Sequence, residues 1–219
     1  MSQQNTPSNS PDQKPWIITY YDLAQLCQNY PDRFSMNELK SRLRTIDEKQ
    51  YLCFDHYLYL YDNAQITHLP DGLRTSKSLI ARNCKNLQSL PEGLTVGIDL
   101  DVSSCPSLRH IPREMQVKGD IYAYDTGLSL VASAYTRLRA LQKNGQIGAV
   151  FGLPITLDKI DPDMKEQDVW QTIAADPTGG AFLIRHYQTV AMMEEVRHHY
   201  QNLLAIAMKH METSSATIH

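Results

Sequence analysis

Several features that define common protein classes are missing from this sequence of 219 residues. The first residues are polar and nearly uncharged, without the basic and apolar regions of a secretory signal peptide. No apolar run approaches the roughly 20 residues that a membrane-spanning helix needs. The formal net charge is −3, which does not favour binding to nucleic acid through a broad basic surface. We therefore expect no membrane span and no nucleic-acid partner.

Cysteine is scarce and confined to the first half of the chain. There is no CxxC pair, so the sequence gives no support to a zinc site. Without a signal peptide, reduced thiols are expected rather than disulfides. Beyond residue 105 the chain has no cysteine, which excludes a thioester-forming enzyme built on the C-terminal region. The four cysteines are Cys27, Cys53, Cys84 and Cys105.

Motifs for catalysis and for metal or phosphate binding are also missing. The chain contains neither GxSxG nor GxxxxGK[ST]. Glu195 and His198 form one ExxH motif, but a di-metal helical bundle needs two such motifs and further glutamates. Asp158, Asp161 and Asp163 lack the glycine and the distal glutamate of a calcium loop. We predict no metal, no cofactor and no catalytic residue, although a Ser/His/Asp site assembled in space stays open.

An internal repeat is the most informative feature that is present. Leu69-Pro70-Asp71-Gly72-Leu73 returns 21 residues later as residues 90–94 and, less regularly, as residues 111–115. Short apolar-x-apolar segments recur at the same spacing, and each is followed three residues later by a small or polar residue. The segments are Leu58–Leu60, Leu79–Ala81, Leu100–Val102 and Ile121–Ala123, followed by Asn63, Cys84, Cys105 and Thr126.

Each repeat has the composition of a short strand and a tight return. The two apolar residues of a strand point inward and the residue between them points outward, because side chains alternate along a strand. Proline and glycine suit the sharp return of the backbone. Strands stacked roughly 4.8 Å apart then form a parallel sheet along one wall of a solenoid, and their inward side chains share one core.

These motifs resemble the leucine-rich repeat family, in the short bacterial form with an LPxxL return. The pattern LxLxx(N/C)xxL stands here at residues 58–66 and 100–108. The resemblance implies an α/β fold with about four parallel rungs and a structural, inward role for Cys84 and Cys105. The repeats are also similar to those of secreted bacterial effectors. Some of these effectors are ubiquitin ligases with a CxD motif after the repeats. Cys53-Phe54-Asp55 lies instead at the entry to the first rung, so we do not expect Cys53 to be a nucleophile.

The repeat divides the chain into four predicted parts. Residues 1–14 are rich in Ser, Asn, Gln and Pro and are expected to be a disordered leader. The leader suits export into a host cell without a cleaved signal peptide, and it suits equally an ordinary terminus of a cytoplasmic protein. Residues 15–50 are predicted as a helical N-terminal cap, residues 51–128 as leucine-rich repeats, and residues 129–219 as a helical C-terminal domain.

The helices of the flanking parts follow from apolar spacing and capping residues. We read Asp176–Gly180 as a turn and residues 147–157 as extended or loop. A stripe in the last helix, from Met193 to Ala207, favours a core-facing surface over a dimer seam, and the oligomeric state is left open. The predicted helices are residues 20–28, 35–46, 130–142, 163–174 and 182–211.

The register of the repeats also predicts which side chains face outward. Tyrosine and arginine are enriched at interface hot spots, and the acidic residues among the outward positions favour a protein partner with a basic patch. Tyrosine also simply suits strands, which is the alternative explanation. The predicted partner-binding residues on the concave face are Tyr59, Tyr61, Arg82, Asp101, Tyr122 and Tyr124. Further outward columns are Asp62, Asn83, Ser104 and Asp125, and Tyr57, Ser78, Asp99 and Asp120.

Three functional hypotheses follow. The first is a non-catalytic protein-interaction module, with the effector role as one form of it. The second is an enzyme whose catalytic site lies in residues 130–219 and includes His186, His198 or Asp161, with the repeats directing it to a target. The third is a regulator whose C-terminal helix docks on another helix or on itself.

Overall fold

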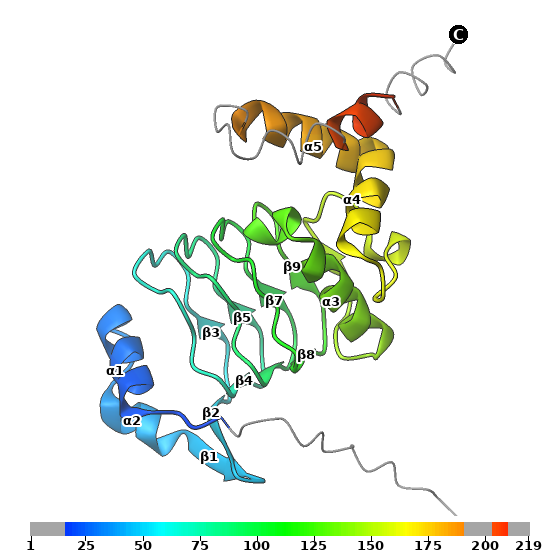
Figure 1. The fold of residues 1–219 in the computed structure, drawn as a ribbon. Helices are drawn as coiled ribbons and strands as arrows, with labels where there is room; N and C mark the ends of the chain where they lie inside the picture. The colour runs from blue at the N-terminus through cyan, green and yellow to red at the C-terminus, as the bar shows by residue number, and fades with distance from the viewer. Residues whose placement is uncertain (1–15, 191–202, 210–219) are drawn as a thin grey trace, which may run out of the picture.

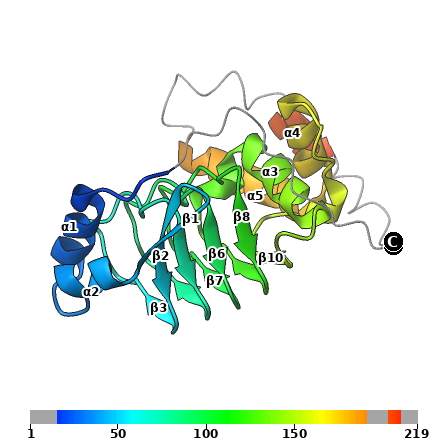
Figure 2. The ribbon, with the colours of Figure 1, turned by 90° about the horizontal axis from the view of Figure 1, so that it is seen from below.

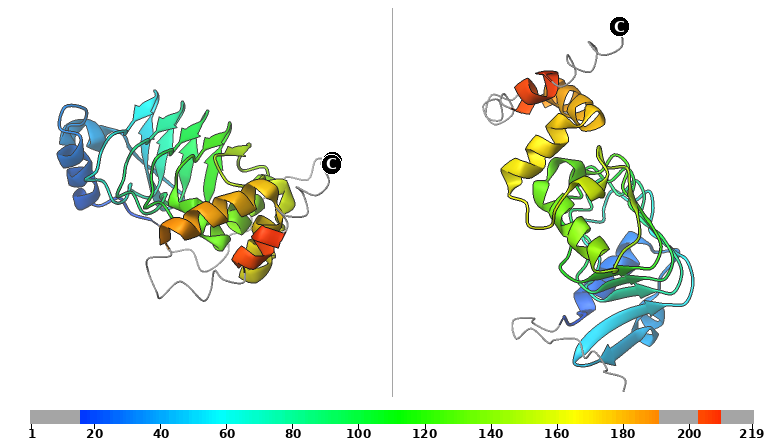
Figure 3. Two further views of the ribbon diagram at one scale, coloured as in Figure 1. Left: turned by 90° about the horizontal axis from the view of Figure 1, so that it is seen from above. Right: turned by 90° about the vertical axis from the view of Figure 1, so that its right-hand side faces the viewer.

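The computed structural model describes residues 16–190 and 203–209. The protein is a mixed α/β fold, and its centre is a parallel-strand β-solenoid of about three turns. Helices α1 and α2 lie at one end of the stacked strands, and α3 and α4 lie at the other end (Figure 1). Seen along the stack, successive turns of the chain overlay one another (Figure 3, right). The expected α/β class is confirmed.

The solenoid is built from two sheets that share the chain's short strands. The helices are α1 (Tyr20–Asn29), α2 (Met36–Ser41), α3 (Ala132–Lys143), α4 (Glu166–Ala175) and α5 (Pro177–Val190), with 3₁₀ turns η1 (Gly127–Leu130) and η2 (Leu157–Lys159). The first sheet has the order β1 (Leu43–Ile46), β2 (Lys49–Phe54), β4 (Leu73–Thr75), β6 (Leu94–Val96) and β8 (Met115–Val117). The second sheet has the order β10 (Val150–Phe151), β9 (Ile121–Tyr122), β7 (Leu100–Asp101), β5 (Leu79–Ile80) and β3 (Leu58–Tyr59).

The predicted register of the repeat is confirmed. Leu58 pairs with Leu79, Leu79 with Leu100, and Leu100 with Ile121, all in parallel strands. The strands lie side by side from the α1 end of the stack to the α3 end (Figure 2). The inward residues Leu79, Leu100 and Val102 are fully buried, as the alternation of apolar residues requires. One hydrophobic core therefore runs through all the turns.

The stack continues past residue 128. Helix α3 stands in the return after β9, and the chain then comes back to the sheets. Ile147 bridges to Val117 of the first sheet, and Val150 and Phe151 form β10 beside β9. The sequence predicts extended or loop structure for residues 147–157. The segment is extended at β10, and its pairing with β9 was missed because the helix lengthens this return and breaks the 21-residue spacing.

The predicted helix over residues 35–46 is too long. Helix α2 ends at Ser41, with Arg42 as its C-cap residue, and residues 43–46 form β1. β1 pairs antiparallel with β2 through a turn in which Asp47 and Glu48 both have positive φ angles, 49° and 65°. Pairing with β2 outweighs the helical spacing of the apolar residues here, and Ile46 is left exposed. The predicted helix over residues 20–28 is confirmed as α1.

The segment that we read as a turn is the start of α5. Asp176 precedes the helix, and its carboxylate accepts hydrogen bonds from the amides of Thr178 (2.9 Å) and Gly179 (3.0 Å). Pro177 occupies the first helical position, where a missing N–H costs nothing. The residues that suggested a turn are thus a helix N-cap and the position that follows it.

The predicted single helix over residues 182–211 is wrong. Residues 203–209 form a short helix that packs against the beginning of α5 (Figure 1). A Cβ atom placed on Gly180 would lie 3.4 Å from the Cβ of Ala207, whereas one straight helix would separate these residues by roughly 40 Å. Leu203 and Ala207 are buried, in keeping with a core-facing stripe.

Some predictions fall on residues outside the described ranges. These are the leader (residues 1–14), the part of the stripe at Met193, Val196 and Tyr200, and His198. None of the helices in the described part of the chain has both the length and the apolar character that crossing a bilayer requires.

Asp176 provides a test of the α5 N-terminus. Burial opposes its ionisation, but hydrogen bonds from Lys159 and from the Gly179 amide outweigh burial and lower the pKa of this carboxyl. We expect Asp176→Ala to lower the free energy of unfolding by about 1 kcal/mol, measured by urea denaturation at neutral pH. Asp176→Asn keeps the capping oxygen and removes only the charge.

The same pair of variants predicts a pH dependence. Because the folded-state pKa of Asp176 is lowered, stabilisation by its charge is present at neutral pH and lost as the pH falls through the folded-state value. The stability difference between the wild type and Asp176→Asn should therefore shrink between pH 7 and a pH below about 4. Equal stability of Asp176→Ala and the wild type at pH 7 would contradict the assignment of the cap.

Candidate functional site

The six predicted partner-binding residues lie on the outer surface of the second sheet. Tyr59, Ile80, Asp101 and Tyr122 are paired in register from β3 to β9, and Phe151 of β10 continues the row. A second row follows the strands, because the amides of Asp62, Asn83 and Ser104 donate to the carbonyl oxygens of the adjacent turns at Arg82, Ser103 and Tyr124. We call this surface the tyrosine face; its residues are Tyr57, Tyr59, Tyr61, Ile80, Arg82, Asp101, Ser103, Tyr122, Tyr124 and Phe151.

Several large aromatic side chains on this face are exposed. Tyr59 is 43% exposed, Tyr61 is 38% exposed and Tyr124 is 50% exposed. Tyr57 and Phe151, which the sequence reasoning did not include among the binding residues, are also exposed. Exposed aromatic residues gathered on one surface are a recognised sign of an interaction site.

The aromatic cluster at the β3 end is held by an arginine from outside the repeats. Tyr57 and Tyr59 are stacked with ring centroids 6.1 Å apart, and Tyr59 meets the ring of Tyr61 edge-on. The guanidinium of Arg33 lies 4.9 Å from the Tyr61 ring centroid and donates a hydrogen bond to the carbonyl oxygen of Tyr59. Sequence reasoning missed Arg33 because it comes from the turn between α1 and α2, and no motif marks it.

A second aromatic cluster lies at the β9 end. Tyr122 and Phe151 are stacked, with ring centroids 5.5 Å apart. Loss of surrounding water raises the pKa of the Tyr122 phenol, and the negative charges of Asp99 and Asp120 raise that pKa further. This end of the tyrosine face is therefore acidic as well as aromatic.

Arg82 and Asp101 connect the two clusters. The Arg82 Nε lies 3.4 Å from the Asp101 Oδ2, and the arginine side chain is 59% exposed. Asp101 Oδ1 also accepts a hydrogen bond from the amide of Ser103 at 3.0 Å. The arginine that we predicted to bind a partner is thus already partly neutralised by a neighbouring turn.

In the column at residues 57, 78, 99 and 120, Tyr57 is exposed, but Ser78, Asp99 and Asp120 do not face freely outward, contrary to the sequence reading. Ser78 is buried, and its hydroxyl accepts a hydrogen bond from the amide of Asp99 (3.2 Å). Asp99 Oδ1 in turn accepts from the amide of Asp120 (2.9 Å), and Asp120 Oδ1 accepts from the amide of Ala149 (2.9 Å). Ser78, Asp99 and Asp120 each satisfy a backbone amide one turn farther along the stack, so these three residues hold the turns together.

The column at residues 62, 83, 104 and 125 is set by the backbone. Asp62, Asn83, Ser104 and Asp125 have φ angles of 58°, 56°, 60° and 55°, which lie in the left-handed region. Short polar side chains, above all Asn and Asp, adopt this region most readily because they bond locally to the backbone. Asn83 Nδ2 donates to Asp62 Oδ1 at 2.8 Å across the turns.

A pocket of about 490 Å³ opens beside the β3 end of the tyrosine face. Its lining combines the aromatic and apolar side chains of β3 with residues of the turn before α2 and of α2 itself. The lining residues are Arg33, Phe34, Glu38, His56, Tyr57, Leu58 and Tyr59.

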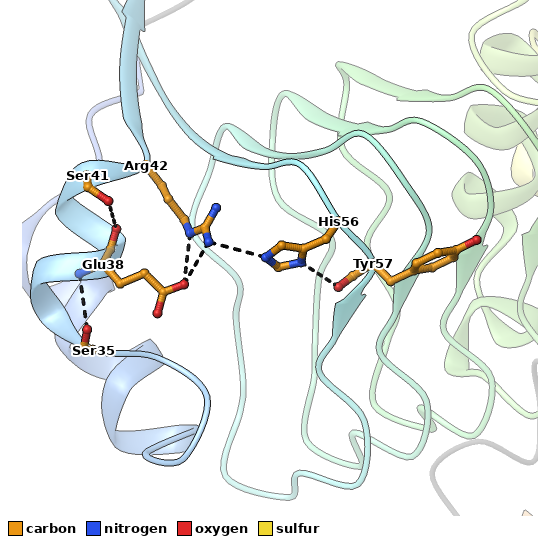
Figure 4. Close-up of polar contacts among 6 residues, drawn as sticks. All are labelled: Ser35, Glu38, Ser41, Arg42, His56 and Tyr57. Atoms are coloured by element: carbon orange, nitrogen blue, oxygen red, sulfur yellow. Dashed lines mark hydrogen bonds and ion pairs between the residues drawn. The ribbon is translucent and has the colours of Figure 1, made fainter.

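A chain of polar contacts fixes one wall of this pocket (Figure 4). The guanidinium of Arg42 donates to Glu38 Oε1 at 2.9 and 3.1 Å, and its Nη2 also lies 3.4 Å from His56 Nε2. His56 Nδ1 lies 2.9 Å from the carbonyl oxygen of Tyr57. Because a guanidinium only donates and a carbonyl only accepts, these two contacts match the His56 tautomer with its hydrogen on Nδ1. The ion pair with Arg42 balances the negative charge of Glu38.

The buried cysteines have the structural role that the repeat resemblance implied. The Cys84 thiol donates to the carbonyl oxygen of Leu60 (2.9 Å), and the Cys105 thiol donates to that of Ala81 (3.2 Å). Contact with Cys84 and burial both raise the pKa of the Cys105 thiol. Burial also raises the pKa of the Cys53 thiol, which is the opposite of what an activated nucleophile needs.

The residues of the enzyme hypothesis are not brought together by the contacts of the described residues. Asp161 accepts from Lys143 Nζ at 3.1 Å, while His186 is stacked on Phe182 with centroids 6.1 Å apart. Hydrogen bonds from the Asp163 amide and from Lys143 lower the pKa of Asp161, as expected for a surface ion pair. Within the described ranges, no group of three or more His, Cys, Asp or Glu residues could hold a metal ion.

Comparisons of the chain with protein-family models, with curated proteins and with solved structures find no match.

The hydrogen bond from Asp120 to Asp99 predicts a measurable difference between two variants. Asp99→Ala leaves a half-buried amide without its acceptor and should lower the free energy of unfolding by about 1–3 kcal/mol. Asp99→Asn keeps an oxygen acceptor and should lose much less. Denaturant titration of both variants would check this, and equal losses would show that the charge, rather than the acceptor, matters.

Proposed function

We propose that this protein is a non-catalytic interaction module that binds a protein partner through the tyrosine face. The observation that carries the proposal is the gathering of exposed aromatic side chains at both ends of one regular sheet surface. The sheet fixes the rows of side chains, so binding would cost little ordering of the site. Tyrosine and arginine are the residue types that most often dominate binding energy at interfaces.

We further propose that the solenoid is a short leucine-rich repeat array and that α1 and α2 cap its first turn. The inward positions of Cys84 and Cys105 and the LPxxL returns support the repeat class. Tyr30 donates to the carbonyl oxygen of Leu60 at 2.7 Å, and Asn63 Nδ2 donates to that of Asn29 at 2.7 Å. These contacts are what a cap needs, because the end of a solenoid otherwise exposes its core. A role as an exported bacterial effector rests on the repeat resemblance alone.

Alanine substitution of three tyrosines tests the proposed surface. Tyr59→Ala, Tyr61→Ala and Tyr124→Ala together should weaken capture of the wild-type partner at least roughly tenfold, because each removes a candidate hot spot. The measurement is quantitative mass spectrometry after affinity purification with the full chain, from bacterial and from animal-cell extracts. Recovery of the partner from one extract and not the other would show whether the partner is a bacterial or an animal-cell protein.

Tyr20 and Tyr21 provide a matched control, since each is 67% exposed but lies on α1. Tyr20→Ala with Tyr21→Ala should leave capture unchanged, and circular dichroism should show that both sets of variants keep the fold. Unchanged capture by the tyrosine-face variants would overturn the proposed surface.

A further inference from the structure

The tyrosine face is chemically different at its two ends, and this asymmetry carries an inference about the partner. We propose that the face binds an extended segment of the partner in one orientation. A large apolar or aromatic side chain of the segment occupies the pocket beside β3, and a neighbouring carboxylate contacts Arg33. A basic side chain farther along the segment lies over the carboxylates around β7 and β9. The inference rests on the proposed function and specifies the ligand chemistry of the same surface.

The pocket fits an apolar anchor because its inner surface is apolar. Leu58 and Phe34 are buried beneath it, and the rings of Tyr57 and Tyr59 form a stacked wall. A cavity of about 490 Å³ has room for one large side chain and part of the adjoining backbone. An anchor side chain in a partly formed pocket is the usual energetic centre of a protein interface.

Arg33 supplies an uncompensated positive charge at the pocket rim. It forms no ion pair within the described part of the chain, and the nearby Glu38 is bound to Arg42. Its hydrogen bond to the Tyr59 carbonyl and its position over Tyr61 hold the guanidinium in place. A fixed, exposed guanidinium has further N–H donors for a carboxylate of the partner.

The opposite end of the face carries the opposite charge. Asp99, Asp101 and Asp120 lie near Tyr122. Loss of surrounding water is the main cause of the raised pKa of the Tyr122 phenol, and the negative charges of these three residues raise that pKa further. The hydrogen bonds that Asp99 and Asp120 accept come from backbone amides, so they leave the formal charges uncancelled. Asp125 adds an exposed carboxylate beside Tyr124. Among these four carboxylates, Asp101 alone has a cationic partner within the described residues, namely Arg82.

The strand spacing sets the distance between the two charges of the segment. β3 and β9 are separated by three strand spacings in the order of the second sheet, which is about 14 Å, and β7 lies at about 10 Å. An extended segment advances about 3.3 Å per residue. We therefore expect the basic residue about three to five positions from the anchor.

Selection of short linear peptides displayed on phage against the full chain tests the inference. Enriched peptides should share an aromatic or large apolar residue, an adjacent Asp or Glu, and a Lys or Arg about three to five positions away. A synthetic peptide of the enriched sequence and a version with its acidic and basic residues exchanged are then compared by fluorescence anisotropy. The wild type should bind the first roughly tenfold more tightly.

Two variants of the protein locate the charges that cause this preference. Arg33→Gln should reduce the preference severalfold. Arg137→Gln should not, because Arg137 is exposed on α3, away from the tyrosine face. At the acidic end, Asp101→Asn combined with Asp125→Asn should also reduce the preference severalfold. Asn suits both positions, since it keeps the Asp101 acceptor and tolerates the left-handed backbone of Asp125. Asp47→Asn, at another left-handed position, is the control.

Three results would overturn the inference. They are a selection without enrichment, enriched peptides without the charge order, and equal affinity for the exchanged peptide. None of these results would contradict the proposed function, because that function is tested separately by capture of the folded partner. If instead the enriched peptide binds the triple tyrosine variant as tightly as the wild type, the tyrosine face itself is the wrong surface.

Discussion

Hydrogen bonding between successive turns of the solenoid is the constraint on which the rest of the structure depends. In the second sheet the amides of Leu58, Leu79 and Leu100 each donate to a carbonyl oxygen of the next turn, at 3.0, 3.0 and 2.9 Å. This register places the two apolar side chains of each strand segment in the core and turns the side chain between them outward. A slip of one residue would exchange the two sets. The tyrosine face therefore follows from the same bonds that bury the core.

The polar side chains of the repeats reinforce that register. Asp71 accepts a hydrogen bond from the amide of Glu92 at 2.9 Å, and Glu92 accepts from the amide of Arg113 at 3.0 Å. Asp99 and Asp120 do the same near the second sheet. The acidic composition of the repeats thus has two origins. The carboxylates of Asp71, Glu92, Asp99 and Asp120 accept hydrogen bonds from backbone amides. Asp99 and Asp120 also contribute negative charge to the β9 end of the tyrosine face.

The repeat made the centre of the fold predictable, because several positions recur together at one spacing. The elements that were missed lack such recurrence. Leu39, Leu43 and Ile46 satisfy helical spacing, but pairing with β2 decides the structure after Ser41. Phe151 sits in a turn lengthened by α3.

The candidate site was predictable to a similar extent. The outward placement of the six residues was predictable because it follows directly from register, whereas their role in binding stays a prediction. Arg33 was not predictable, because its place over Tyr61 depends on how the segment before α2 packs against the first turn. Contacts between a repeat and a non-repeat segment have no sequence period, so only the folded chain shows them. Likewise, the pocket beside β3 exists only where these two parts meet.

The amide-to-carboxylate bonds between turns have a consequence for how such a protein can change in evolution. A whole repeat inserted or deleted leaves each remaining carboxylate opposite an equivalent amide, so the ladder stays complete. An insertion of one or two residues within a strand segment leaves donors and acceptors out of step. Insertions in a return are tolerated, as α3 demonstrates. The width of the tyrosine face is thereby free to grow only in whole strands, each adding about 4.8 Å.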